Sequence, residues 1–248
     1  MRRRCTSDTH RVFRTLSPEQ PPPLPFRRLA LSSITCGLLI TAPTLLGQPV
    51  AERTSWRSAF DSAGVSGTFP IMRIGIDTAF ASDAARANRR FLPASTFKIP
   101  NSLIALELGT VRDEQQVFPY DWPRTEIAAW NRDHTFRTAL KYSVVPVYQA
   151  IARQIGEPAY RDWLARLDYG NADPAGGIDH FWLDGNLRIS SIEKLEFLGR
   201  LALLQLPMSE RSQRVVHAML VVEANACGVM HAKTGLLGSL PCPGSNIS

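Results

Sequence analysis

A serine and a lysine three positions apart, Ser95 and Lys98, directly precede an apolar run of the chain. The run covers residues 103–108 and stops at Gly109. A glycine after such a run is typical of a helix C-terminus, and apolar residues nearly all round predict a buried helix. Because residues i and i+3 share a helix face, we expect Ser95 Oγ and Lys98 Nζ to lie within reach of each other.

This pair has the parts that acyl transfer needs. A serine at a buried helix N-terminus is surrounded by free backbone N–H groups, and a desolvated amine beside it can act as a base. The structural alternative is that Ser95 only caps the helix and that Lys98 extends to the solvent. The motif taken alone leaves both interpretations open.

The net charge of +6 is concentrated near the N-terminus. Residues 1–53 hold eight arginines against three acidic residues, a balance of +5, which leaves +1 for the other 195 residues. The body of the chain therefore has no basic patch of the kind that binds nucleic acid, and we expect no nucleic-acid partner.

Cysteine and histidine spacing gives no sign of a metal site. The four cysteines form no C-x-x-C pair, and the five histidines form neither H-x-H nor H-E-x-x-H. We therefore predict no bound metal. A disulfide between Cys227 and Cys242 and two free thiols both fit the sequence, and we favour the free thiols.

The first 53 residues are predicted to be a leader. The pair Arg27-Arg28 precedes an apolar-leaning stretch, residues 29–47, that contains polar residues and Pro43. A positive pair before a short apolar region predicts a secretory signal peptide and a periplasmic location, with membrane contact only through that signal. A disordered tail followed by a membrane anchor is the alternative.

The remaining pattern predicts one α/β lobe with a largely helical insertion. Expected helices cover residues 56–63, 143–156, 160–167, 191–206 and 212–222, expected strands cover 66–76 and 229–235, and residues 82–90 are expected to be a connector.

Three further groups of residues accompany the Ser-x-x-Lys pair. They are Ser143-Val144-Val145, Tyr169-Gly170-Asn171 with the later Phe181-Trp182-Leu183, and Lys233-Thr234-Gly235. Each has a structural alternative. Ser143 could be an N-cap, Tyr169-Gly170-Asn171 a turn, Trp182 a core aromatic and Lys233-Thr234-Gly235 the end of a strand. Lys233 is the hardest to explain structurally, because a cation, a hydroxyl and a glycine at a strand end suit close approach of an anionic substrate.

Together these residues resemble the class D, oxacillinase-type, serine β-lactamases. The resemblance rests on residues 91–106, 142–149, 169–171, 176–190 and 231–235, in the order of the family's motifs. It implies an α/β (α+β) fold of the penicillin-binding transpeptidase kind over residues 54–236. That fold has an antiparallel sheet lobe and an all-helical lobe. The implied activity is hydrolysis of β-lactam antibiotics.

The resemblance also implies a role for each motif residue. Ser95 is the nucleophile, and Lys98 becomes N6-carboxylysine by reaction with CO2, so CO2 or bicarbonate is required and no other cofactor is. The other implied roles are a proton relay at Ser143, the electrostatic field at Lys233, binding of the substrate carboxylate at Thr234, an oxyanion hole at the N–H groups of Ser95 and Leu236, and a pocket completed by Val145, Trp182, Leu183 and Gly235.

Carboxylation of Lys98 has a direct physical rationale. Burial among Phe97, Val145, Trp182 and Leu183 is expected to depress the pKa of the amine, and a neutral amine can attack CO2. The resulting carbamate is a better base at neutral pH than an ammonium group. The indole of Trp182 can only donate a hydrogen bond, which suits an anion.

The residues after Gly235 depart from the family pattern. The family continues into further strands, a closing helix and an arginine that helps to bind the substrate carboxylate, whereas residues 237–248 carry two prolines and two glycines and no arginine. We therefore expect an aberrant tail, missing C-terminal strands and helix, an exposed sheet edge and weak or absent activity.

Three other functions fit parts of the pattern. A penicillin-sensing domain or a cell-wall transpeptidase would be acylated without turnover, and an inactive remnant would not be acylated. The absence of H-E-x-x-H argues against the sensor, and Ser143-Val144-Val145 argues against the transpeptidase, which more often carries Ser-x-Asn. The motifs specify neither the oligomeric state nor the preferred β-lactam.

Overall fold

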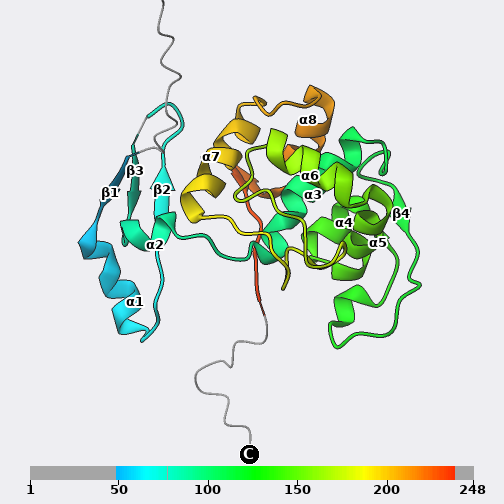
Figure 1. Cartoon of the computed structure of the whole chain (residues 1–248), viewed down its shortest axis with the longest axis horizontal. Coiled ribbons are helices and arrows are strands. Elements are labelled where there is room, and N and C mark those ends of the chain that lie inside the picture. Colours follow the sequence, from blue (N-terminus) through cyan, green and yellow to red (C-terminus); the bar gives the residue numbers. More distant parts are fainter. Residues whose placement is uncertain (1–48, 77, 238–248) are drawn as a thin grey trace, which may run out of the picture. The chain divides into compact units, whose positions relative to one another are not determined.

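The computed structural model describes residues 49–76 and 78–237 (Figure 1). The predicted signal peptide and residues 238–248 of the predicted tail, with Cys242, lie outside the described residues. Cys227 is exposed and has a free thiol. Within the described ranges, no helix is both long enough and apolar enough to cross a membrane.

The elements follow one another in an order that places short strands at both ends of the helical part. They are β1 (Val50–Glu52), η1 (Thr54–Arg57), α1 (Ser58–Ser62), β2 (Pro70–Met72), β3 (Ala79–Ala81), α2 (Ala84–Asn88), η2 (Ala94–Phe97), α3 (Lys98–Glu107), β4 (Val117–Phe118), η3 (Ala128–Trp130), β5 (His134–Thr135), α4 (Phe136–Lys141), α5 (Val145–Ile155), α6 (Glu157–Arg166), α7 (Ser191–Ala202), α8 (Glu210–Met219), β6 (Val221–Asn225) and β7 (Gly228–His231).

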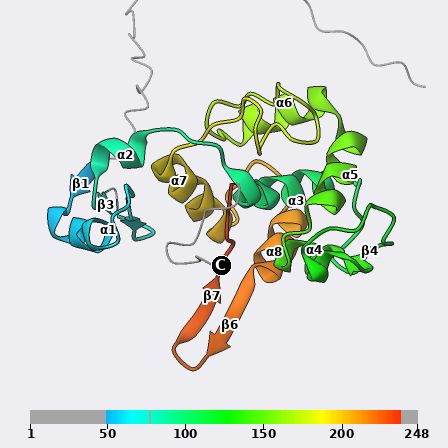
Figure 2. The same cartoon turned by 90° about the horizontal axis from the view of Figure 1, so that it is seen from below.

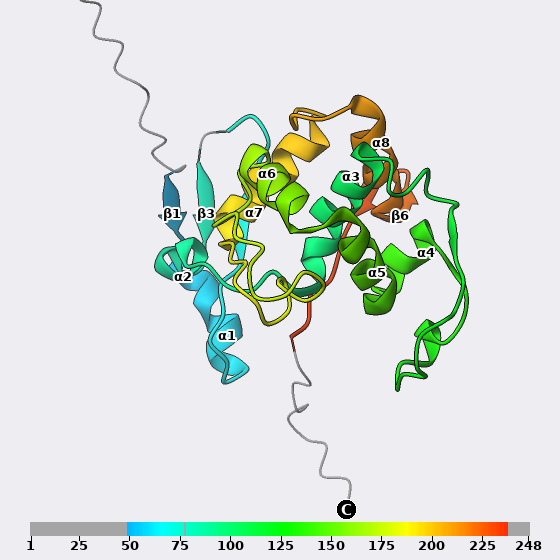
Figure 3. The same cartoon turned by 45° about the vertical axis from the view of Figure 1, so that its right-hand side comes forward.

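Helix α3 is the centre of the hydrophobic core. Every residue from Lys98 to Leu106 is buried, as expected for a helix that is apolar nearly all round. Helices α5 and α8 pack against it (Figure 3). Gly109 follows the helix with φ +71°, which confirms the predicted glycine C-terminus. The first turn, η2, is a 3₁₀ helix, so the α-helix itself begins at Lys98.

The next helices largely follow the predicted periodicity. In α5 the predicted face is buried at Val147 and Ile151. Helix α7 begins as expected at Ser191, where Ser190 and Glu193 form a reciprocal capping box, but it ends at Ala202 instead of 206. Leu204, two residues after the end of α7, has φ +56°, a backbone conformation that an α-helix does not contain.

The first sheet is mixed, which corrects the expected antiparallel sheet. Its order is β1-β3-β2, with β1 and β3 parallel and β2 and β3 antiparallel. Strand β1 lies within residues 1–53, so the sheet includes part of the predicted leader. Strand β2 covers only the centre of the predicted strand 66–76, and it begins at Pro70, which has no N–H to donate.

Residues 82–90 are not a plain connector. They include helix α2, which begins where the side chain of Asp83 accepts a hydrogen bond from the N–H of Arg86 at 2.9 Å. An aspartate in this position caps a helix N-terminus, a signal that the composition of the segment obscured.

The C-terminal part of the described chain is a β-hairpin (Figure 2). The predicted helix 212–222 is present as α8, which begins two residues earlier and ends at Met219; strand β6, which the sequence does not predict, follows it. Strand β7 pairs with β6 and ends at His231, so Lys233 lies after the strand and not inside it. All of β6 is exposed, and this exposure explains why the sequence shows no alternation there.

Candidate active site

The chain places both predicted active-site serines on or next to an unusual backbone conformation. Ala94, directly before Ser95, has φ +48°, and Ser143 has φ +59°. Residues other than glycine rarely adopt this left-handed region, and such residues cluster at functional sites. The N–H of Ala94 donates to the carbonyl of Trp182 at 3.0 Å and holds the Ser95 turn against that tryptophan.

Lys98 and Ser95 are hydrogen-bonded. Lys98 Nζ donates to Ser95 Oγ at 3.1 Å, and the lysine is 0% exposed. The alternative that Lys98 extends to the solvent is therefore wrong, and Ser95 makes no side-chain cap. Burial, together with the nearby charge of Lys233, lowers the pKa of Lys98 to about 7. Much of this amine is therefore neutral at neutral pH.

Ser143 and Lys233 form the second pair. Lys233 Nζ donates to Ser143 Oγ at 3.0 Å and to its neighbour's carbonyl, that of Thr234, at 2.8 Å. Burial lowers the pKa of Lys233 to about 8. Ser143 lies in the turn between α4 and α5, two residues before the helix that was expected to start there. The tertiary structure thus joins residues that are 90 positions apart.

The site is positively charged and has no internal counter-ion. Neither Lys98 nor Lys233 forms an ion pair with a carboxylate of the described chain. A buried and a half-buried amine without an acidic partner favour a bound anion. No group of three or more potential metal-ligating His, Cys, Asp or Glu residues occurs within residues 49–76 and 78–237.

Trp182 has a buried hydrogen-bond donor without an acceptor. Its side chain is 0% exposed and stacks on Phe97 with ring centroids 5.3 Å apart. Its Nε1 has no hydrogen-bond partner. Buried polar groups are nearly always paired, so this donor is what an anion attached to Lys98 would require. The residues present therefore fit a carboxylated lysine.

The predicted binding residues Thr234, Gly235 and Leu236 are exposed and follow strand β7. Gly235 lies directly against the Ser95 turn: a Cβ built on it would be 2.9 Å from Thr96 Cγ2. This contact brings the Lys233 segment beside Ser95. Val145 and Leu183 are half-buried at the first residue of α5 and directly after Trp182.

Two contributors to the site were not predicted. Lys194 of α7 donates a 2.7 Å hydrogen bond to Thr96 Oγ1, and Tyr169 packs against Phe97 with ring centroids 6.0 Å apart. Tyr148 lies beneath Lys98, with Nζ 5.3 Å from its ring centroid, and pairs with Ser102 at 2.8 Å. Tyr169 belongs to the predicted Tyr-Gly-Asn group, but nothing in the sequence marks Lys194, which is about a hundred positions from its partner.

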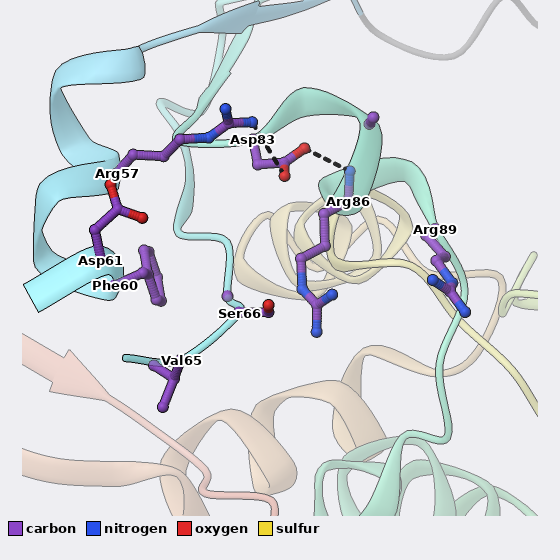
Figure 4. Close-up of a pocket in the computed structure, with 10 residues that line it drawn as sticks. Arg57, Phe60, Asp61, Val65, Ser66, Asp83, Arg86 and Arg89 are labelled. Carbon is purple, nitrogen blue, oxygen red and sulfur yellow. Dashed lines mark hydrogen bonds and ion pairs between the residues drawn. The ribbon is translucent and has the colours of Figure 1, made fainter. Parts of the chain in front are cut away.

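A pocket away from the Ser95 turn is lined by none of the predicted site residues. Figure 4 shows it between α1 and α2, where Arg57 reaches Asp83 at 3.2 Å and Arg86 extends into the hollow. Its volume is about 540 Å³; the carboxylates of Asp61 and Asp83 line it, but it has no buried nucleophile. The chemistry therefore belongs to the Ser95 turn.

Comparison with known proteins agrees with this geometry. The penicillin binding protein transpeptidase domain family matches residues 59–239. β-Lactamase OXA-48 of Klebsiella pneumoniae is 47% identical over 209 residues, which cover 84% of this chain and 79% of that protein. The chain belongs to the class D β-lactamase family. Its fold is accordingly the penicillin-binding transpeptidase and β-lactamase fold, as predicted.

Other class D β-lactamases show the same relationship. OXA-10 of Pseudomonas aeruginosa is 43% identical over 195 residues, covering 79% of this chain and 73% of that protein. Among solved structures, FUS-1 (OXA-85), a class D β-lactamase from Fusobacterium nucleatum subsp. polymorphum, superposes with a TM-score of 0.72 at 34% identity. That match covers 75% of this chain and 78% of the other. Class D β-lactamases are hydrolases, so this chain is assigned to an enzyme family.

Proposed function

We propose that this protein hydrolyses β-lactam antibiotics through an acyl-enzyme on Ser95, with carboxylated Lys98 as the general base, and so confers antibiotic resistance. The observation that carries the proposal is the 3.1 Å contact between Lys98 Nζ and Ser95 Oγ at a fully buried lysine. A nucleophile and a base within hydrogen-bond reach are the geometric requirement for this chemistry.

The environment of Lys98 supports its carboxylation. Its lowered pKa leaves a neutral amine that can attack CO2 to form a carbamate and release one proton. The unpaired Nε1–H of Trp182 is available to the carbamate oxygens, and the charge of Lys233 favours an anion nearby. The carbamate would supply the base that accepts the proton of Ser95 and later the proton of water.

The other side chains act on the substrate. Ser143, held by Lys233, is placed to pass a proton to the lactam nitrogen when the ring opens. Thr234 binds the substrate carboxylate and Lys233 supplies the positive electrostatic field, which that carboxylate would neutralise. The N–H groups of Ser95 and Leu236 stabilise the oxyanion of the tetrahedral intermediate.

Export to the periplasm is part of the proposal. The positive pair Arg27-Arg28 and the apolar-leaning stretch 29–47 support a signal peptide. A β-lactamase in the periplasm would meet the antibiotic before it reaches the cell-wall enzymes. Antibody detection of the protein in periplasmic and cytoplasmic fractions tests this part separately.

One experiment tests the catalytic proposal. The purified 248-residue chain is mixed with a penicillin, with and without bicarbonate, and its intact mass is followed over time. We expect a transient adduct of the mass of the whole penicillin, lost faster with bicarbonate. A persistent adduct under both conditions would indicate a sensor or transpeptidase, and no adduct would indicate an inactive remnant.

A further inference from the structure

A second cavity lies next to the Ser95 turn and shares Lys233 with the proposed active site. It has a volume of about 310 Å³ and opens between β2, α7, α8 and the end of β7. Of the residues of the candidate active site, Thr96, Lys194 and Lys233 also line it, whereas Ser95, Lys98 and Ser143 do not. Its volume is at the small end of ligand pockets, which span about 300–1,000 Å³.

The titratable groups that line this cavity are all basic. Its titratable lining groups are Lys194, Lys233, His217 and His231, and no aspartate or glutamate lines it. Lys194 is half-buried, and its one hydrogen bond goes to a neutral hydroxyl, Thr96 Oγ1, at 2.7 Å. No ion pair is found for it among the described residues. A desolvated amine in this state favours a negatively charged partner.

The two histidines form one face of the cavity. The rings of His217 from α8 and His231 from β7 lie 3.9 Å apart, centroid to centroid, with 34° between their planes. Imidazole N–H groups can donate to a carboxylate. The absence of any acidic lining group makes a divalent cation a poor occupant here, because two histidines alone leave most of its coordination unfilled and two lysines repel it.

The rest of the lining is apolar. Leu195 and Leu198 of α7 line the cavity together with Ile74, Ile99 of α3 and Leu220. A small inorganic anion would leave this surface in contact with water, whereas a ligand with a hydrocarbon body would cover it. Apolar walls with a few converging polar groups are typical of sites for small organic ligands.

We propose that this cavity binds a small carboxylic acid with an apolar body, its carboxylate against Lys194 and the two histidines and its hydrocarbon part against Leu195 and Leu198. Binding at this cavity does not require β-lactam hydrolysis. Its test is therefore independent of the test of the proposed function.

Binding of decanoate to the full chain, measured by calorimetry, tests the proposal. We expect saturable binding of one decanoate, with binding of decan-1-ol and of acetate at least tenfold weaker, because the site needs both the charge and the chain. Equal affinity for decanoate and decan-1-ol, or no saturable binding of decanoate, would overturn it.

Two variants locate the site. Lys194→Gln removes the charge while keeping a hydrogen-bond donor for Thr96, and Leu198→Trp fills the cavity while keeping the charge. Each is expected to weaken decanoate binding at least tenfold, while Lys141→Gln, an exposed lysine outside the cavity, binds as the wild type does. Unchanged affinity in either cavity variant, checked to be folded by circular dichroism, contradicts the proposal.

Histidine ring NMR gives a readout that does not depend on any variant. Decanoate is expected to shift the resonances of His217 and His231 and to leave those of His134 and His180, which do not line the cavity, in place. Shifts confined to His134 or His180 would place the ligand elsewhere and overturn the assignment.

Discussion

Gly235 packs directly against Thr96. A Cβ added at Gly235 would lie 2.9 Å from Thr96 Cγ2 and 3.4 Å from the carbonyl oxygen of Pro93. Real Cβ atoms almost never come so close to other atoms, so even one methyl group must push the two segments apart. This contact sets the spacing between the segment that carries Lys233 and the turn that carries Ser95.

Gly235→Ala is therefore expected to lower kcat/KM for nitrocefin by about 10–100-fold, because a displacement of about 1 Å at reacting groups has that scale of effect. Thr96→Ser removes Cγ2 but keeps the hydroxyl that Lys194 binds. The double variant Thr96→Ser with Gly235→Ala should recover much of the loss. Equal activities of the single and double variants would show that the contact does not set the spacing.

Lys98→Ala removes the proposed base. Without it, Ser95 is an ordinary hydroxyl, and we expect nitrocefin turnover to fall by about 10²–10⁴-fold. The control is Arg166→Ala, because Arg166 is exposed at the end of α6, forms an ion pair with Asp162 at 2.9 Å and lines none of the cavities that hold Lys233. Near wild-type turnover by Lys98→Ala would exclude Lys98 as the base.

Trp182→Phe tests the unpaired indole donor. Phenylalanine keeps an aromatic ring against Phe97 but removes Nε1, so the carbamate on Lys98 would lose a hydrogen bond. We expect the bicarbonate concentration that gives half-maximal activity to rise about tenfold, which corresponds to roughly 1.4 kcal/mol. Maximal activity should return at high bicarbonate.

Trp122→Phe is the control for that variant. Its Nε1 is also buried and unpaired, but Trp122 lines a different cavity, beside Phe118 and Val147. Its bicarbonate dependence should match that of the wild type. If both tryptophan variants shift equally, the effect does not come from a contact with Lys98.

The buried lysine also predicts how stability changes with pH. In the unfolded chain the pKa of Lys98 is about 10.5, and burial and Lys233 lower it to about 7 in the folded protein. Between these values the unfolded chain binds more protons, so the free energy of unfolding rises with pH. Below about pH 7 the full penalty for burying the charge is present.

Lys98→Met removes this penalty. In CO2-free buffer, the variant should gain stability over the wild type at pH 6.5, and the advantage should shrink by pH 10, by at most about 1.4 kcal/mol per pH unit. Urea unfolding at both pH values measures it. A difference that is the same at pH 6.5 and pH 10 would mean that Lys98 titrates normally.

Local sequence patterns were sufficient for the elements that interact over one or two turns. Ser95 and Lys98 are neighbours through helical spacing alone, and the buried α3 follows from its apolar composition. The prediction failed where pairing partners are distant or where a side chain faces water. The parallel β1–β3 pair, the short α2 and the exposed β6 carry no periodic signal.

The sequence by itself determined the chemistry available to this protein: a serine, a lysine three residues later and the motif residues of a class D β-lactamase. Only the tertiary structure decided that Lys98 is fully buried, that Lys233 donates a hydrogen bond to Ser143, 90 positions away, and that Lys194 donates one to Thr96. The reason is physical. A pKa depends on the solvent and charges that surround a group, and those surroundings come from segments far apart in the chain.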